Sequence, residues 1–89
     1  MEYSSNFKVL NIQEISRRNS EELKEEDKTF LKLNLLDFNN NPCSFMIFGK
    51  DKNKVLELDL KSLEDVVITF GVNYNKDRWN VNFIDIDIR

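Results

Sequence analysis

Four residues around one short polar turn carry side chains that could bind a single-stranded nucleic acid. They are Tyr74, Lys76, Arg78 and Trp79, and they flank or occupy the segment 75–77. Aromatic rings can stack on bases, and Lys or Arg can contact phosphates. The alternative is structural, because a Tyr–Trp pair across two strands stabilises a hairpin by about 0.2–1 kcal/mol. The residue types alone leave both interpretations open.

The sequence lacks the residues of most catalytic sites. It has no His, which removes the usual general base, the commonest metal ligand and the His-activated nucleophiles. The single Cys43 excludes an internal disulfide and a Cys-based zinc site, and favours a reducing, cytoplasmic location. Asp85 and Asp87 could bind Mg²⁺, but their alternation with Ile favours a solvated strand face. We therefore expect no enzyme activity, metal or cofactor.

Composition and charge predict one small globular domain spanning residues 1–89. Hydrophobic residues make up 40% of the chain and charged residues 33%. The net charge is −3, but residues 19–27 hold five acids and one Lys, so this segment is −4 and the other 80 residues are +1. Strong non-specific phosphate binding is therefore not expected. No signal-peptide pattern and no apolar run near the ~20 residues of a membrane span occur, so no membrane segment is expected.

Two hairpins are predicted from side chains that alternate with a period of two. In the second hairpin, 65–87, the alternating residues are Val66, Ile68, Phe70, Val72 and Tyr74, followed by Trp79, Val81 and Phe83. Phe83 and Ile84 break this alternation, which indicates a β-bulge or a sharp bend. The first hairpin spans 28–48, and its turn is the sequence Asn-Asn-Asn-Pro at 39–42.

The remaining segments connect or precede these hairpins. Residues 1–6 are expected to be a loose tail, and 7–18 a first strand. The acid-rich segment 19–27 has one apolar residue and is expected to be a solvated loop. The leucines of 55–63 suit either a helix or a strand, so we expect a short helix or an extended linker over one end of the sheet. The predicted fold class is therefore all-β, with five mostly antiparallel strands.

The order of these elements resembles an oligonucleotide/oligosaccharide-binding (OB) fold, which is a five-stranded barrel. The sequence LKSLEDVVITFGV at 60–72 resembles the pattern L-K-x-G-D-x-V-x-V-x-G at the start of the fourth strand, with Glu64 in place of the first Gly. Residues 30–50 resemble the hairpin of strands two and three. Residues 74–86 resemble the N-G-R-W hairpin of small phage and bacterial proteins similar to single-stranded-DNA-binding proteins. These stretches cover about half of the chain.

The OB resemblance implies a ligand site on strands two and three and on the loops between strands one and two and strands four and five. One face of the second strand carries Phe30, Lys32, Asn34, Leu36 and Phe38, and Phe48 follows the third strand beside it. The opposite face, Thr29, Leu31, Leu33 and Leu35, is the better candidate for the core. Phe30 and Phe48 are thus left for base stacking, for an interface or for packing under loops, and Lys32 for a phosphate contact.

Together these features predict a non-catalytic module that binds single-stranded nucleic acid, DNA over RNA, from a phage or mobile element. The alternative is a protein-interaction or assembly module on the same fold. Arg17 and Arg18 precede the acidic segment and could pair with it or contact phosphates. Exposed aromatic residues and the Ile-rich last strand also predict a homodimer, because a monomer would normally cover such patches and edges.

Overall fold

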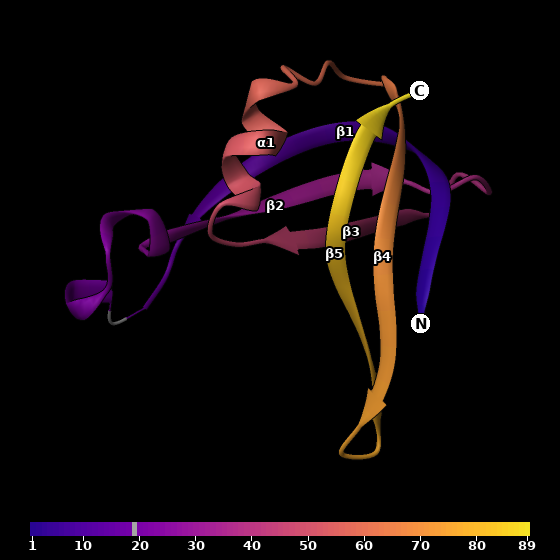
Figure 1. Cartoon of the computed structure of the whole chain (residues 1–89). Helices are drawn as coiled ribbons and strands as arrows, with labels where there is room; N and C mark the ends of the chain where they lie inside the picture. Colours follow the sequence, from indigo (N-terminus) through magenta and orange to yellow (C-terminus); the bar gives the residue numbers. More distant parts are fainter. Residues whose placement is uncertain (19) are drawn as a thin grey trace.

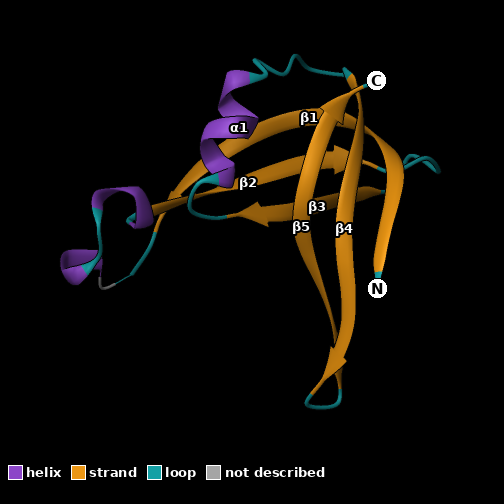
Figure 2. Cartoon of the chain, in the orientation of Figure 1, coloured by secondary structure: helices purple, strands orange, loops and turns teal. Residues whose placement is uncertain are grey.

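The computed structural model describes residues 1–18 and 20–89 and shows one five-stranded antiparallel sheet (Figures 1 and 2). Its strands, in the order β3-β2-β1-β4-β5, are β1 (Glu2–Ser16), β2 (Thr29–Leu36), β3 (Pro42–Ile47), β4 (Asp65–Asn75) and β5 (Arg78–Ile88). The mainly-β class and both hairpins are confirmed. The sheet is not closed into a barrel, since β3 and β5 are its edges and no ladder joins them among the described residues. The predicted barrel is therefore not confirmed.

The long strand β1 joins the two halves of the sheet. Its first residues pair with β4 from Glu2↔Gly71 to Lys8↔Asp65, and the rest pairs with β2 up to Ser16↔Thr29. The register shifts between Val9 and Asn11, close to the point where β1 passes from one partner to the other. In Figure 1 the β4–β5 hairpin crosses the layer of β1, β2 and β3 and extends beyond it.

The predicted loose tail at 1–6 is wrong. Residues 2–6 belong to β1, and the backbone of Met1 also bonds to β4, because the Val72 N–H donates to the Met1 carbonyl at 2.8 Å. This segment has few apolar side chains, so its order comes from backbone hydrogen bonds to β4. A tail without a clear hydrophobic pattern can still form a strand when a partner strand lies beside it.

The core lies between the two halves of the sheet. Its buried side chains are Phe7, Val9, Leu31, Leu33, Leu35, Phe45, Ile47, Val55, Val66, Ile68 and Ile86. Leu31, Leu33 and Leu35 confirm the aliphatic face of β2 as its core side. Val55 comes from the short helix α1 (Asp51–Glu57), which covers one end of the core (Figure 1).

The connector between β3 and β4 contains the expected short helix, but at a different position. α1 spans Asp51–Glu57 rather than starting at 55, and Leu58 and Leu60 pack on the core from the turns after it. The helix is anchored by Val55, while Leu56 is exposed. The leucine spacing used for the prediction therefore belongs mostly to the segment after the helix.

The bulge predicted in the last strand is confirmed. Thr69 pairs with Asp85 but Phe70 pairs with Phe83, so Ile84 is the extra residue of β5. A bulge changes the phase of the alternation. As a result, Phe83 packs against the core cluster and Ile86 is buried within it, although three positions separate them.

The acidic connector contains two short 3₁₀ helices, η1 (Ser20–Glu22) and η2 (Glu25–Asp27), where a solvated loop was expected. Asn19, the first residue of that prediction, lies outside the described residues. The ends of the connector are close together, because the Arg17 N–H donates to the Lys28 carbonyl at 2.8 Å. Lys28 also pairs with Glu25 at 3.2 Å. Within residues 1–18 and 20–89, no helix is long and apolar enough to cross a membrane.

Candidate nucleic-acid interface

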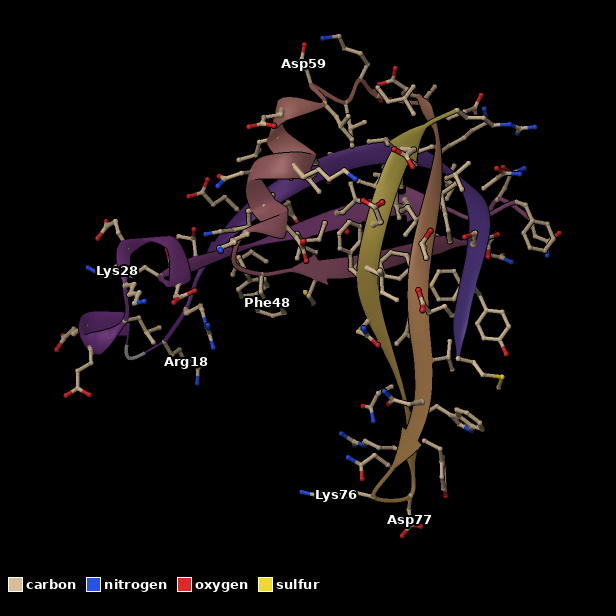
Figure 3. All side chains as sticks on the ribbon, viewed as in Figure 1. Arg18, Lys28, Phe48, Asp59, Lys76 and Asp77 are labelled. Carbon is tan, nitrogen blue, oxygen red and sulfur yellow. The ribbon has the colours of Figure 1, made fainter. Side chains whose placement is uncertain are left out.

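The predicted site residues fall into two separate groups. Phe30, Lys32 and Phe48 lie on or beside β2 and β3, whereas Tyr74, Lys76, Arg78 and Trp79 lie at the tip of the β4–β5 hairpin. Figure 3 shows Phe48 beside β3 and Lys76 at the far end of the projecting hairpin. The two groups therefore do not form one site, and each must be judged by its own surroundings.

The first group lies on the side of β1–β3 that faces away from the core, which we call the outer face. Its residues alternate with the buried residues along each strand, and they lie opposite one another in the β1–β2 and β2–β3 pairings. They are Asn11, Gln13 and Ile15 of β1, Phe30, Lys32, Asn34 and Leu36 of β2, Ser44 and Met46 of β3, and Phe48 directly after β3. None of these residues is acidic.

An aromatic pair with a cation above it occupies one end of the outer face. The rings of Phe30 and Phe48 have centroids 5.2 Å apart and planes at 32°. Phe48 is 50% exposed, so much of its ring is available to a ligand. The guanidinium carbon of Arg17 lies 5.6 Å from the centre of the Phe48 ring, within the range of a cation–π contact. This end of the face offers both an aromatic surface and a positive charge.

A row of amide side chains crosses the outer face next to this pair. The Asn34 side-chain nitrogen donates to the Asn11 Oδ1 at 2.7 Å and to the Gln13 Oε1 at 3.1 Å. Lys32 is half-buried between them and the aromatic pair, opposite Gln13 on one side and Met46 on the other. Amides provide both donors and acceptors, which is what the polar edges of bases require.

The start of β2 is held by the helix. The Lys52 ammonium of α1 donates to the Thr29 carbonyl oxygen at 2.9 Å and to its hydroxyl at 3.3 Å. Thr29 directly precedes Phe30, so this contact fixes the strand end that carries the aromatic pair. A groove of about 360 Å³ also adjoins the outer face, and its lining includes Met46, Phe48, the acidic Asp51 of α1, and Val81 and Asn82 of β5.

The hairpin group is built around a two-residue turn. Lys76 has φ 52° and Asp77 has φ 61°, the left-handed values that a type I′ hairpin turn requires. Tyr74 and Trp79 are paired across the strands with ring centroids 5.2 Å apart, and they are 58% and 67% exposed. The structural interpretation considered from sequence, a cross-strand Tyr–Trp pair, is therefore present.

Of the two cations expected to act with these rings, Lys76 lies in the turn itself and Arg78 lies on the other face of the hairpin. Arg78 pairs with Asn75, whereas its neighbour Trp79 pairs with Tyr74, and successive residues of a strand point to opposite faces. The aromatic and basic side chains that are adjacent in sequence are thus separated. This separation could have been derived from the period-two pattern itself.

Two further members of the outer-face site, Asn11 and Gln13, were not predicted from the sequence, and Arg17 was predicted as a phosphate or ion-pair contact but not at its position over Phe48. Their alternation along the first strand was visible, but the strands beside it were not. The signal that would identify them is the register of β1 against β2, which places Gln13 opposite Lys32 and Ile15 opposite Phe30.

The ionisable groups with altered pKa values lie outside the two groups of candidate site residues. The Lys54 ammonium bonds to Asp85 and joins α1 to β5, which lowers the pKa of the Asp85 carboxyl and raises the pKa of Lys54. The Asp85 carboxylate, considered above as a Mg²⁺ ligand, is therefore paired with Lys54. Burial, with a smaller contribution from Asp37, raises the pKa of the Cys43 thiol. Over the described part of the chain, no cluster of three His, Cys, Asp or Glu residues could hold a metal ion.

Comparison of this chain with protein-family models, with curated proteins and with solved structures finds no match. We therefore infer the function from the side chains of the two groups and from the residues that surround each group.

Proposed function

We propose that this protein is a non-catalytic module that binds single-stranded nucleic acid on the outer face of β1–β3. The observation that carries the proposal is the half-exposed Phe30–Phe48 pair with Arg17 over the Phe48 ring. Stacking surfaces flanked by cations are the usual means of binding single strands without sequence preference. DNA is the first ligand to test, because the sequence resemblance is to proteins similar to single-stranded-DNA-binding proteins.

Each part of the outer face has a role in the proposed complex. A base stacks on the exposed part of Phe48, which contributes about 1–3 kcal/mol. Arg17 and Lys32 contact the phosphates on either side of that base. The amides of Gln13 and Asn34 are placed to bond with the edge of a neighbouring base. With two cations on this face, the expected affinity is moderate and falls with salt.

We further propose that the fold is a partly open OB-like barrel. Its support is that β1 pairs with both β2 and β4, while the two edge strands, β3 and β5, line the same groove. In OB folds the ligand lies on strands two and three. The proposed site occupies the same strands, and the groove continues it toward β5.

Fluorescence anisotropy with labelled oligo-dT and oligo-U, at low and moderate salt, tests this function. We expect Phe48→Ala to weaken binding by the ~1–3 kcal/mol of one lost stack, which is about 5- to 150-fold. Phe38→Ala is the matched control, because Phe38 is 75% exposed but lies in the turn after β2. Absence of wild-type binding at low salt would reject the proposal. An equal loss of affinity in Phe48→Ala and Phe38→Ala would show that the site is not centred on Phe48.

The alternative function, a protein-interaction module on the same fold, is favoured by a different surface. The whole chain is acidic, with a net charge of −3, and the apolar side of the β4–β5 hairpin is uncovered. The side chains of that surface are not those of the outer face.

A further inference from the structure

The β4–β5 hairpin and the start of β1 share an apolar surface that extends beyond the core. We call it the hairpin face, and it consists of Met1, Tyr3, Val72, Tyr74, Trp79 and Val81. Val72 pairs with Val81 and Tyr74 with Trp79, while the Tyr3 ring lies 6.1 Å from that of Phe70. The Tyr3 hydroxyl donates to the Met1 sulfur at 3.5 Å, which places Met1 on the same side.

The opposite side of the same hairpin is polar throughout. Asn73 pairs with Asn80, and Asn75 pairs with Arg78. Asn82 lies over Gly71, where an added Cβ would come within 2.7 Å of its side-chain oxygen. Strict alternation of apolar and polar faces is typical of an antiparallel sheet with one side covered and the other solvated.

A single chain does not provide the cover that this alternation demands. The core ends at Phe70 and Phe83, which pack against it. Beyond them Met1 is 81% exposed, Tyr3 46%, Tyr74 58%, Trp79 67% and Val81 56%. The pattern that buries Val66 and Ile68 thus continues to the hairpin tip, but nothing in the described chain lies over its last part.

We propose that a second copy of this chain covers the hairpin face, so that two copies pack by this side of their sheets. The six side chains of the face are uncharged, and the Asp77 carboxylate accepts a hydrogen bond from the Tyr74 hydroxyl at 3.4 Å. The face itself therefore offers a phosphate no basic side chain. An identical apolar face is its natural complement, since two sheets can pack face to face at about 10 Å.

The size of the surface fits a dimer of modest affinity. For side chains of about 150–250 Å² each, the exposed fractions leave about 600 Å² on the hairpin face. Two such faces would bury about 1,200 Å², which is the lower limit of a stable interface. We therefore expect dimers at micromolar rather than nanomolar concentration.

The middle of β5, between Arg78 and Asp85, also lacks the usual protection of an edge strand against pairing. Residues 79–84 contain no charge and no Pro, although Lys, Pro and short length are the common means of blocking an edge strand. The dimer interface uses no residue of the outer face, but the two proposed sites meet at Val81, which belongs to the hairpin face and also lines the groove beside Met46 and Phe48.

Sedimentation velocity of the whole chain across the micromolar range tests the proposal. We expect a species of twice 10.6 kDa in the wild type. Trp79→Glu should raise the dimer dissociation constant by about 30-fold or more, the effect of removing a hot-spot aromatic. Asn80→Glu is the matched control, since it adds the same charge at the next position on the polar side and should leave the dimer intact.

A second measurement separates the interface from misfolding. Trp79 is the sole tryptophan, so its emission should shift to shorter wavelength as the wild type dimerises. Tyr74→Glu should abolish that shift while the circular dichroism of the sheet is retained. A wild type that stays at 10.6 kDa would overturn the proposal, as would a folded Trp79→Glu variant that still dimerises. Quenching of Trp79 by oligo-dT in the monomer would assign the hairpin face to nucleic acid instead.

Discussion

Two aromatic pairs in this protein have the same ring separation but different surroundings, and their ring planes meet at 32° in the first pair and 55° in the second. The Phe30–Phe48 and Tyr74–Trp79 rings are each 5.2 Å apart. The first pair lies beside Arg17, Lys32 and a row of amides, whereas the second continues an apolar surface and its nearest arginine points to the opposite side. The chemistry of an aromatic pair is thus decided by the residues that share its face.

The two pairs also differ in mechanical support. β2 lies between β1 and β3, and the reverse side of its outer face is the buried row Leu31, Leu33 and Leu35. The pairing of the β1 segment with β4 ends at Val72, which bonds to Met1, so the hairpin tip beyond it is a two-stranded ribbon. Such ribbons are marginally stable alone, and a covering partner would supply what the core does not reach.

The largest change in stability is expected from truncating a buried side chain of β2, the strand that carries Phe30. Leu33→Ala should destabilise the protein by about 2–5 kcal/mol, because Leu33 is fully buried behind the outer face. Lys32→Ala, its neighbour on the outer face, should change stability by less than about 1 kcal/mol. Urea unfolding measures both, and similar values would show that β2 is not the central support.

A pair of arginine variants tests the electrostatic difference between the regions. Arg17→Ala should reduce the slope of log affinity for oligo-dT against log salt by about one phosphate contact. Arg78→Ala should leave that slope unchanged, since Arg78 lies at the hairpin tip. Anisotropy titrations at several salt concentrations give the slopes. The reverse result would place the nucleic-acid site on the hairpin.

The hairpin turn offers a way to stiffen the weaker region. Asp77→Gly should raise stability by up to about 1 kcal/mol, because Asp77 has φ 61° and Gly adopts this conformation without steric cost. Asn75→Gly, at a strand position without positive φ, should lower stability instead. Thermal melts at a concentration below dimerisation compare the two. A loss of stability in Asp77→Gly would show that its contact with the Tyr74 hydroxyl, at 3.4 Å, outweighs the backbone strain.

Acid should weaken two ion pairs, one that links β1 to β4 and one that links α1 to β5. Hydrogen bonds from Lys8 to Asp65 and from Lys54 to Asp85 lower the pKa of both carboxyls. Since the pKa is lower in the folded state, these pairs stabilise it above about pH 4, the unfolded value, and their contribution is lost as pH falls through the folded pKa. Asp85→Asn should flatten the dependence of the urea midpoint on pH between 6 and about 3. An unchanged pH profile in Asp85→Asn would show that the Lys54–Asp85 pair contributes nothing to stability.

The smallest effect is expected from the acidic connector. Deleting residues 20–26 should leave the melting temperature almost unchanged, because the Arg17 N–H and the Lys28 carbonyl already close the ends of β1 and β2. Affinity for oligo-dT should rise, since the deletion removes four acids and one Lys near the aromatic pair. A loss of several degrees by calorimetry would show that η1 and η2 are packed against the body.

The strands and their core side could be read from the sequence because the signal is local. Alternating side chains point to opposite faces wherever a strand forms. The aliphatic row of β2 and the phase slip at Phe83–Ile84 therefore predicted the core and the bulge correctly. The first six residues were missed because their order comes from backbone bonds to β4, which leave no mark in side-chain pattern.

The sequence by itself determined which side chains share a strand face, including the separation of Arg78 from Trp79. Only the tertiary structure decided which strands lie side by side. It brings Arg17 over Phe48 and Asn34 onto Gln13, and it leaves the hairpin tip beyond the reach of the core. The physical reason is that alternation is a property of neighbouring residues, whereas strand order and register depend on contacts between residues far apart in the chain.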